Sequence, residues 1–271
     1  MAINSEEKND NKDQPSWKVN SVAKCIQILQ KFTVEKPEWQ LTQLSKELSI
    51  PKSTLLNMLK TLQMYGYITR LNNQNYSLGI ELLALSYNVY GSLPIIQSAT
   101  PLMEDIQEKT GKIVYFTIPL KGKCFYLEGV YPGKRNITYS VTGRKLLMHC
   151  TGCGKAMLSG MKDEDIDKII SAYGLPKYTS TTITEPNNLK KEIQKIRERG
   201  YAIDLGEETP GVKCVAVPIK NRDRLLGAFS ISGSTMTMHD DILPGYAEML
   251  TEASYLLSTK GDLFPPCQPL P

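Results

Sequence analysis

Residues 41–67 limit what this chain can fold into more than any other stretch, because they predict two short helices joined at a tight corner. We expect the first helix over residues 42–48, with Thr42 as its N-cap. Pro51 has no backbone N–H and holds the preceding Ile50 in extended geometry, so the first helix must end there. Proline is well tolerated where a helix begins, so a second helix can follow directly. The stretch predicts a helix-turn-helix.

The second helix has two different surfaces. Leu55, Leu59 and Leu62 recur at helical spacing and predict a buried stripe. The opposite surface carries short polar and basic side chains, which are those of Lys52, Ser53, Thr54, Asn57 and Lys60. This surface suits a helix that enters a DNA major groove, with its lysines on phosphates and its Ser, Thr and Asn side chains at base edges. An ordinary amphipathic surface helix would show the same pattern, and both interpretations remain open from this stretch alone.

The residues after the second helix favour the DNA interpretation. Residues 67–71 and 76–78 alternate apolar and polar side chains on either side of the Asn-rich segment 72–75, which predicts a β-hairpin. A helix-turn-helix followed by a hairpin is a winged helix, in which Arg70 and the hairpin tip would lie along the DNA backbone. The charge distribution agrees, because residues 15–80 contain eight Lys and Arg but only three Glu and Asp.

At this point the chain resembles the IclR family of bacterial transcriptional regulators over roughly residues 19–257. The motifs that carry the resemblance are SVAKCIQILQKF (21–32), LSIPKSTLLNMLKTLQMYGYI (48–68), YSLGIELLAL (76–85), TGRKLLMHCTGCGKAML (142–158), RGYAIDLGEETPGVKCVAVPI (199–219) and GAFSISG (227–233). The resemblance implies a small, mainly α winged helix-turn-helix domain joined by a linker helix to an α+β effector-binding domain with an antiparallel, GAF/PAS-like sheet. It also implies a homodimer or homotetramer.

We expect five segments along the chain. Residues 1–16 are polar and predict a disordered leader. The DNA-binding domain should cover residues 17–78, the linker helix residues 79–94 and the effector-binding domain residues 95–260. Residues 261–271 predict a Pro-rich tail that joins no core. The first helix should begin at Asn20 and bury Val22, Cys25, Ile26 and Leu29, while the resemblance places Lys24 near the DNA backbone. The resemblance implies that the linker helix pairs two subunits, although a helix packed on its own domain is the alternative.

Strands and helices alternate in the second half of the chain. We expect strands over residues 113–119, 123–130, 137–141, 201–204, 212–219 and 225–232. The expected helices cover residues 99–110, 155–158, 163–173, 189–199 and 243–257. Hairpins separated by helices predict an α+β domain built on an antiparallel sheet.

A candidate effector site begins at the glycine-containing turn 149–155. Free backbone N–H groups at the helix that follows would attract a carboxylate or another anion. The resemblance places a pocket between this turn and strand residues further on, which gives the candidate residues Gly152, Cys153, Asp204, Cys214, Ser230 and Ser232. Ser230 and Ser232 would point the same way from one strand. We expect a carboxylate or sugar-acid-like metabolite, the alternative being that these are ordinary strand and turn residues.

The cysteines leave two further hypotheses open. Cys150 and Cys153 have C-x-x-C spacing, and with Cys214 and His149 they could form a zinc or thiol-responsive site. The sequence has no second C-x-x-C and only two histidines, so two half-buried thiols beside the pocket are the simpler expectation. A Cys/His enzyme is the other alternative, but no nucleophile motif is visible. We therefore expect no catalytic residues, metal or cofactor.

The expected function is that of a ligand-responsive regulator, most simply a repressor of a catabolic or metabolic operon, that binds double-stranded operator DNA. No apolar run is long enough to cross a bilayer and the N-terminus has no signal-peptide core, so we expect a cytoplasmic protein without a membrane partner. Six cysteines without a secretory signal predict free thiols.

Overall fold

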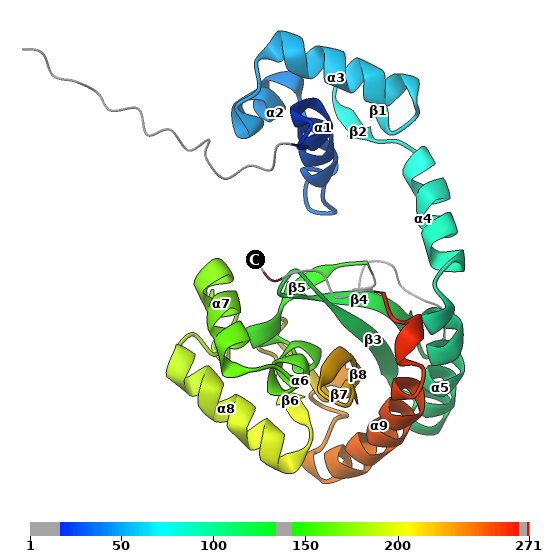
Figure 1. The fold of residues 1–271 in the computed structure, drawn as a ribbon, viewed down its shortest axis with the longest axis vertical. Helices are drawn as coiled ribbons and strands as arrows, with labels where there is room; N and C mark the ends of the chain where they lie inside the picture. The colour runs from blue at the N-terminus through cyan, green and yellow to red at the C-terminus, as the bar shows by residue number, and fades with distance from the viewer. Residues whose placement is uncertain (1–16, 134–142, 266–269, 271) are drawn as a thin grey trace, which may run out of the picture. The chain divides into compact units, whose positions relative to one another are not determined.

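The computed structural model describes residues 17–133, 143–265 and 270, and divides the chain into two compact units, Met1–Gly91 and Ser92–Pro271 (Figure 1). The expected leader 1–16, the expected strand 137–141 and part of the expected tail lie outside the described residues. No helix in the described ranges is both long and apolar enough to cross a membrane.

The first unit is a winged helix. Its helices are α1 (Asn20–Gln30), α2 (Leu41–Leu48) and α3 (Lys52–Met64), and its wing is the antiparallel pair β1 (Ile68–Arg70) and β2 (Tyr76–Leu78). Trp39 extends the wing by a bridge to Tyr76. The small core between these elements consists of Ile28, Phe32, Trp39, Leu44, Ile50, Leu55, Leu59, Ile68 and Tyr76. The helix-turn-helix and hairpin predicted from the sequence are both present.

The corner between α2 and α3 is fixed by backbone geometry and one buried side chain. Ser49 has a left-handed backbone (φ 53°), Ile50 is buried, and the Ser45 hydroxyl donates to the Ile50 carbonyl at 2.6 Å. Pro51 has an extended backbone and directly precedes Lys52, the first residue of α3. The predicted N-cap at Thr42 is wrong: α2 begins one residue earlier and Gln40 occupies the cap position. Leu41 packs against the core, which draws the helix start forward and leaves Thr42 exposed.

Helix α1 does not bury the stripe expected of it. Val22 and Ile26 are 55% and 49% exposed, whereas Ile28 is fully buried. Only the C-terminal end of α1 reaches the core, where Leu29 and Phe32 also pack. Helix α4 (Glu81–Gly91) also leaves most of its apolar side chains exposed, because none of its residues is fully buried within the described chain.

The second unit is built on one six-stranded sheet in which every neighbouring pair is antiparallel, with the order β5-β4-β3-β8-β7-β6. The strands are β3 (Ile113–Leu120), β4 (Lys123–Val130), β5 (Lys145–Leu147), β6 (Ala202–Asp204), β7 (Val212–Asn221) and β8 (Arg224–Ser234). The α+β expectation is confirmed, and the edge strand β5 is an addition to it.

Helices cover both faces of this sheet (Figure 1). Helices α5 (Pro94–Thr110) and α9 (Leu243–Ser258) pack on one face, and α6 (Gly152–Ser159), α7 (Asp163–Tyr173) and α8 (Pro186–Arg199) pack on the other. Helix α5 starts five residues before its expected start at Ala99, because Pro94 occupies its first turn and Ile95 and Ile96 are buried.

The expectation of a tail without a core to join is wrong for its first residues. A short 3-10 helix, η4 (Gly261–Leu263), follows α9, and Phe264 is buried in the core of the second unit. Its ring meets that of Phe116 edge-on at 5.9 Å between centroids. The apolar side chain after α9 thus extends the domain beyond residue 260.

Candidate functional site

The surface of α3 that was predicted to read DNA is exposed in full. Lys52, Ser53, Thr54, Asn57 and Lys60 are all exposed, whereas Leu55 and Leu59 are fully buried. Leu62 completes the stripe but is only half-buried. The buried stripe fixes the rotation of α3 on its core, and the polar side chains therefore project away from the domain together.

A groove of about 550 Å³ runs beside these side chains, between α1 and α3. Its polar lining includes Ser53, Thr54 and Asn57, and its apolar lining includes Val22 and Met58. The sequence did not indicate this groove, because it depends on how α1 crosses α3. Polar groups for base edges thus stand next to apolar groups that can accept a thymine methyl.

The remaining expected DNA contacts are spread over three elements. Lys24 is half-buried on α1, Thr42 is exposed in the first turn of α2, and Arg70 is exposed at the end of β1. The Arg70 guanidinium lies 5.8 Å from the Tyr76 ring centroid. At the hairpin tip the amides of Asn75 and Asn73 both donate to Glu38 at 3.0 Å, and these two hydrogen bonds lower the pKa of the Glu38 carboxyl. The Glu38 carboxyl therefore lies against the tip amides, which leaves Arg70 as the wing residue suited to phosphate.

The candidate effector residues come together at the start of α6. A side chain at Gly152 would have no room, since its Cβ would lie 2.5 Å from the Cys214 sulfur and 3.6 Å from Asp204 Cβ. Cys214 pairs with Asp204 on one side and with Ser232 on the other. Ser230 lies two residues from Ser232 on the same strand and therefore on the same face. The structure thus gathers the residues named from the sequence.

Hydrogen bonds connect this group, and every member of it is buried. The Cys214 thiol donates to Asp204 Oδ2 at 3.8 Å, and the Cys153 thiol is hydrogen-bonded with Cys124 and Ser230. Burial raises the pKa of the Asp204 carboxyl and raises that of the Cys214 thiol well above its usual value. We call Gly152, Cys153, Asp204, Cys214, Ser230 and Ser232 the effector cluster.

A buried ion pair that the sequence analysis missed supports the effector cluster. Lys155, 1% exposed, bonds to Glu207, 5% exposed, and donates to the Ile203 carbonyl at 2.7 Å. The Glu207 backbone N–H in turn donates to Asp204 Oδ1 at 2.8 Å. Burial raises the pKa of Glu207 to about 7, against the opposing effect of Lys155. The pair is 52 residues apart in the chain, and no local pattern could have indicated it.

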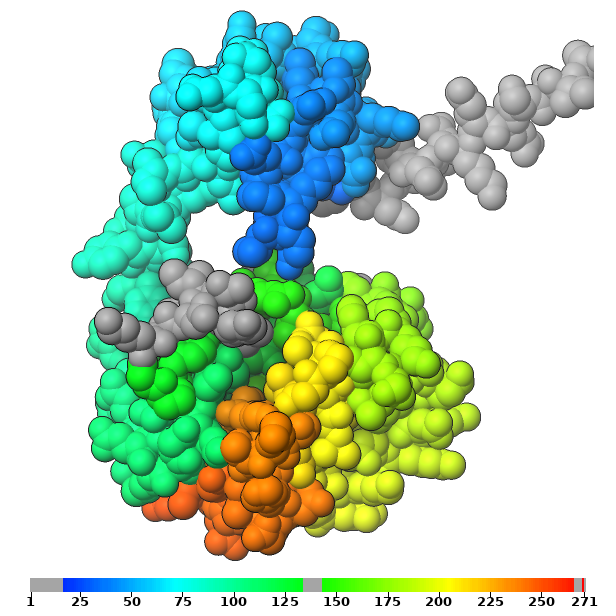
Figure 2. Space-filling model, turned by 180° about the vertical axis from the view of Figure 1, so that it is seen from behind, coloured from blue at the N-terminus to red at the C-terminus, as the bar shows by residue number. Residues whose placement is uncertain are grey.

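The ion pair joins α6 to a surface segment. The connection between β6 and β7, which carries Glu207, lies beside the residues between α7 and α8 (yellow beside lime in Figure 2). Thr181 and Thr182 donate to its carbonyls at 3.1 and 2.5 Å. The ion pair and these hydrogen bonds thus connect α6 with the residues between α7 and α8.

The cysteine alternatives find little geometric support. The Cys150 thiol faces the Leu147 carbonyl at 3.6 Å, so it points to a different partner from Cys153, and both thiols are fully buried, not half-buried as expected. Burial, with Glu208 and Asp204, raises the pKa of Cys150 to about 12. The His149 ring contacts the Pro176 carbonyl at 3.1 Å. Within the described residues no three His, Cys, Asp or Glu side chains are arranged to hold a metal ion.

Two family models match the chain. The IclR helix-turn-helix domain matches residues 21–71, and the model described as bacterial transcriptional regulator IclR C-terminal matches residues 87–259. The HTH-type transcriptional regulator XynR of Escherichia coli (strain K12) is 33% identical over 242 residues, which cover 89% of this chain and 96% of that protein. The transcriptional repressor IclR of the same organism is 25% identical and covers 87% of this chain and 88% of that protein.

Solved structures show the same architecture. A putative IclR regulator from Silicibacter sp. TM1040 has a TM-score of 0.76 at 25% identity and covers 93% of this chain and 99% of that chain. An IclR homolog from Microbacterium hydrocarbonoxydans, complexed with 4-hydroxybenzoate, shares the fold with a TM-score of 0.72 at 20% identity, covering 89% and 99% of the two chains. With both domains matched and a relative of 33% identity aligned over nearly its whole length, this chain belongs to the IclR family of bacterial transcriptional regulators, which are DNA-binding proteins and not enzymes.

Proposed function

We propose that this regulator represses a catabolic or metabolic operon and releases its operator when a small carboxylate or sugar-acid-like metabolite occupies the effector cluster. The observation that carries the proposal is the pairing of an exposed polar helix surface with a buried polar cluster in a separate unit. The first suits a large, charged, solvated partner, and the second suits a small, desolvated one.

In the proposed complex α3 enters the major groove of double-stranded operator DNA. Lys52 and Lys60 contact phosphates, and Ser53, Thr54 and Asn57 contact base edges. Lys24, Thr42 and Arg70 add contacts to the backbone on either side. All of these side chains except the half-buried Lys24 are exposed, so contact with DNA requires no unfolding of the domain.

A homodimer, or a tetramer made of two dimers, is the proposed active form. Helix α4 exposes large apolar side chains, which are those of Leu83, Leu85, Tyr87, Val89 and Tyr90. Leu83, Tyr87 and Tyr90 recur at i, i+4 and i+7 and so share one side of the helix, and an exposed apolar surface of this kind marks an interaction site. Pairing of α4 helices would set the spacing of two α3 helices at about 34 Å, one turn of DNA.

The effector cluster suits an anionic, hydroxylated ligand. Ser230 and Ser232 offer hydroxyls, and the positive end of the helix dipole at the start of α6 favours a carboxylate. Asp204, whose pKa burial raises, can accept a hydrogen bond from a ligand hydroxyl. The ligand named for the Microbacterium relative, 4-hydroxybenzoate, also carries one carboxylate and one hydroxyl. Repression is the activity named for the IclR relative of Escherichia coli.

Titration of operator binding tests this proposal. The full chain is added to labelled DNA from upstream of its own gene, and candidate carboxylates and sugar acids are titrated in a gel-shift assay. We expect at least one to weaken DNA binding tenfold or more, and Ser230→Ala/Ser232→Ala to lose this response while it retains its DNA affinity without ligand. DNA binding that no carboxylate or sugar acid alters, or a full response in the serine variant, would contradict the effector assignment.

A further inference from the structure

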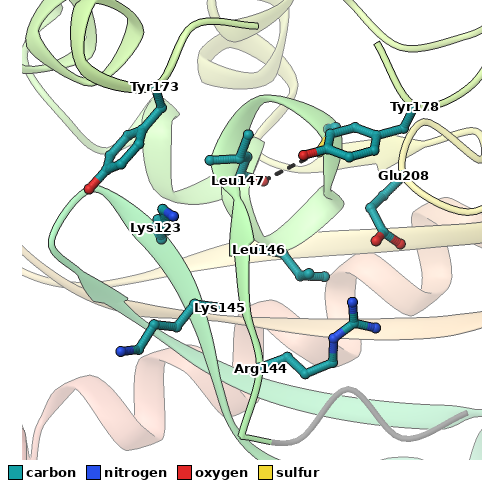
Figure 3. A pocket seen from close by; sticks show the side chains of 9 residues that line it. Lys123, Arg144, Lys145, Leu146, Leu147, Tyr173, Tyr178 and Glu208 are labelled. Atoms are coloured by element: carbon teal, nitrogen blue, oxygen red, sulfur yellow. Dashed lines mark hydrogen bonds between the residues drawn. The ribbon is translucent and has the colours of Figure 1, made fainter. Parts of the chain in front are cut away.

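A second pocket, of about 360 Å³, lies along both sides of the edge strand β5 (Figure 3). None of its lining residues belongs to the effector cluster. Its volume is within the range of small-molecule sites, roughly 300–1,000 Å³. The charged and phenolic side chains that line it come from β4, β5 and the residue before β5, α7, and the two connections that follow α7 and β6, so the site is built from several elements.

One half of the pocket is cationic. Lys123 and Lys145 lie on the same side of β5 as the ring of Tyr173 (Figure 3). The Lys123 ammonium is 4.7 Å from that ring centroid, and the Tyr173 hydroxyl donates to the Lys121 carbonyl at 2.5 Å, which fixes the ring. Among the described residues neither lysine has a carboxylate within ion-pair distance. Two neighbouring positive charges of this kind attract one acidic group.

The other half offers hydrogen-bonding groups of both kinds. Across β5 the Arg144 guanidinium points toward the Glu208 carboxylate, and Tyr178 stands beside them (Figure 3). Glu208 also accepts a hydrogen bond from the Thr209 hydroxyl. Burial, with the nearby Cys150 and Glu208, raises the pKa of Tyr178, so its phenol keeps its proton. A guanidinium, a phenol and a carboxylate together suit ligand hydroxyls, which both donate and accept.

We propose that this pocket is a second ligand site that binds a polyhydroxylated organic anion. Its acidic group lies between Lys123 and Lys145, and its hydroxyls meet Arg144, Tyr178 and Glu208. Sugar acids and sugar phosphates share this chemistry. The site does not depend on the proposed effector assignment, but the two are connected in the chain, because Cys150 lines the pocket two residues before Gly152 and Glu208 directly follows Glu207.

Calorimetric titration of the full chain tests the proposal with four probes. Gluconate and glucose 6-phosphate carry both features, glucose lacks the acid, and inorganic phosphate lacks the hydroxyls. We expect gluconate, glucose 6-phosphate or both to bind at least tenfold more tightly than either partial probe. Preference between the two then identifies the acidic group. Equal affinity for inorganic phosphate, or no binding of either complete probe, would overturn the proposal.

Matched variants locate the binding. Lys123→Gln/Lys145→Gln should weaken binding of the complete probe at least tenfold, whereas Lys162→Gln/Lys191→Gln removes the same charge from exposed positions outside the pocket and should have no effect. Ser230→Ala/Ser232→Ala should leave this binding unchanged. The reverse result would be that the serine variant loses binding of the complete probe and the lysine variant retains it. That result would assign the ligand to the effector cluster, overturn the second site and support the proposed function.

Discussion

The α3 surface and the effector cluster are both polar, but they are built in opposite ways. The α3 surface comes from one continuous helix and is exposed, whereas the effector cluster is assembled from α6, β6, β7 and β8 and is buried. An exposed polar surface can change without cost to the fold, while every polar group in a buried cluster must find a partner. The comparison predicts that substitutions on α3 change DNA binding but not the free energy of unfolding. Substitutions in or beneath the effector cluster should lower the free energy of unfolding.

The largest expected effect is on the ion pair beneath the effector cluster. At pH 8, where Glu207 is ionised in the ion pair, Lys155→Met should lower the free energy of unfolding by about 3–5 kcal/mol, because it leaves a buried acid without its partner. Chemical denaturation monitored by circular dichroism measures this. The double variant Lys155→Met/Glu207→Leu should recover most of the loss, since it removes both charges. A double variant no more stable than the single one would show that the pair is not what holds α6 in place.

Stability should also depend on pH through Glu207. A carboxyl whose pKa rises from 4.5 to about 7 on folding binds its proton more tightly in the folded state, so its contribution is full below pH 4.5 and is lost as pH rises through about 7. The change is about 3 kcal/mol, at 1.36 kcal/mol per pKa unit. The raised pKa of Asp204 acts in the same direction. Denaturation between pH 4.5 and 8 should show the decline, and Glu207→Gln should flatten it; an unchanged slope in that variant would exclude Glu207 as the cause.

A smaller effect is expected from crowding within the effector cluster. Gly152→Ala should destabilise the protein by about 1–3 kcal/mol, because the added methyl overlaps the Cys214 sulfur. Thermal unfolding measures the loss. Cys214→Ala in the same chain removes the overlapping atom and should restore most of it. No rescue by Cys214→Ala would mean that the two positions are not in contact.

Substitutions on α3 should leave stability within about 0.5 kcal/mol and change only DNA binding. Asn57→Ala should relax preference at one base pair, by about 1–3 kcal/mol. Lys52→Ala should weaken binding to all sequences and lower the salt slope by about 1. Fluorescence anisotropy with matched and mismatched operators over a salt series checks both. The roles are wrong if Lys52→Ala alters base preference or Asn57→Ala alters the salt slope.

The contrast between one continuous helix and a cluster assembled from several elements also explains what the sequence could predict. The buried Leu55 and Leu59 and the corner before Pro51 are local features, and residue spacing alone predicted them. The effector cluster was named through the family resemblance, since no spacing connects Gly152 with Cys214. The Lys155 and Glu207 pair was missed because contacts 52 residues apart leave no local trace.

Errors in the sequence analysis have a common cause. Helix α1 has apolar residues at helical spacing, but a domain of this size covers only one end of it, and Val22 and Ile26 stay exposed. Phe264 was assigned to a tail because prolines follow it, but its ring packs against that of Phe116. Periodicity indicates which residues can be buried together, and the neighbouring elements decide which of them are.

Helix α4 has a consequence for how the protein responds to its own abundance. None of its apolar side chains is fully buried within the described chain, so in the proposed dimer most of their apolar surface leaves water only when two subunits associate. Mass action then links the folding of this segment to the concentration of the chain. A bacterium that makes more of the regulator would obtain both more copies and a larger assembled fraction, and operator occupancy would rise more steeply than expression.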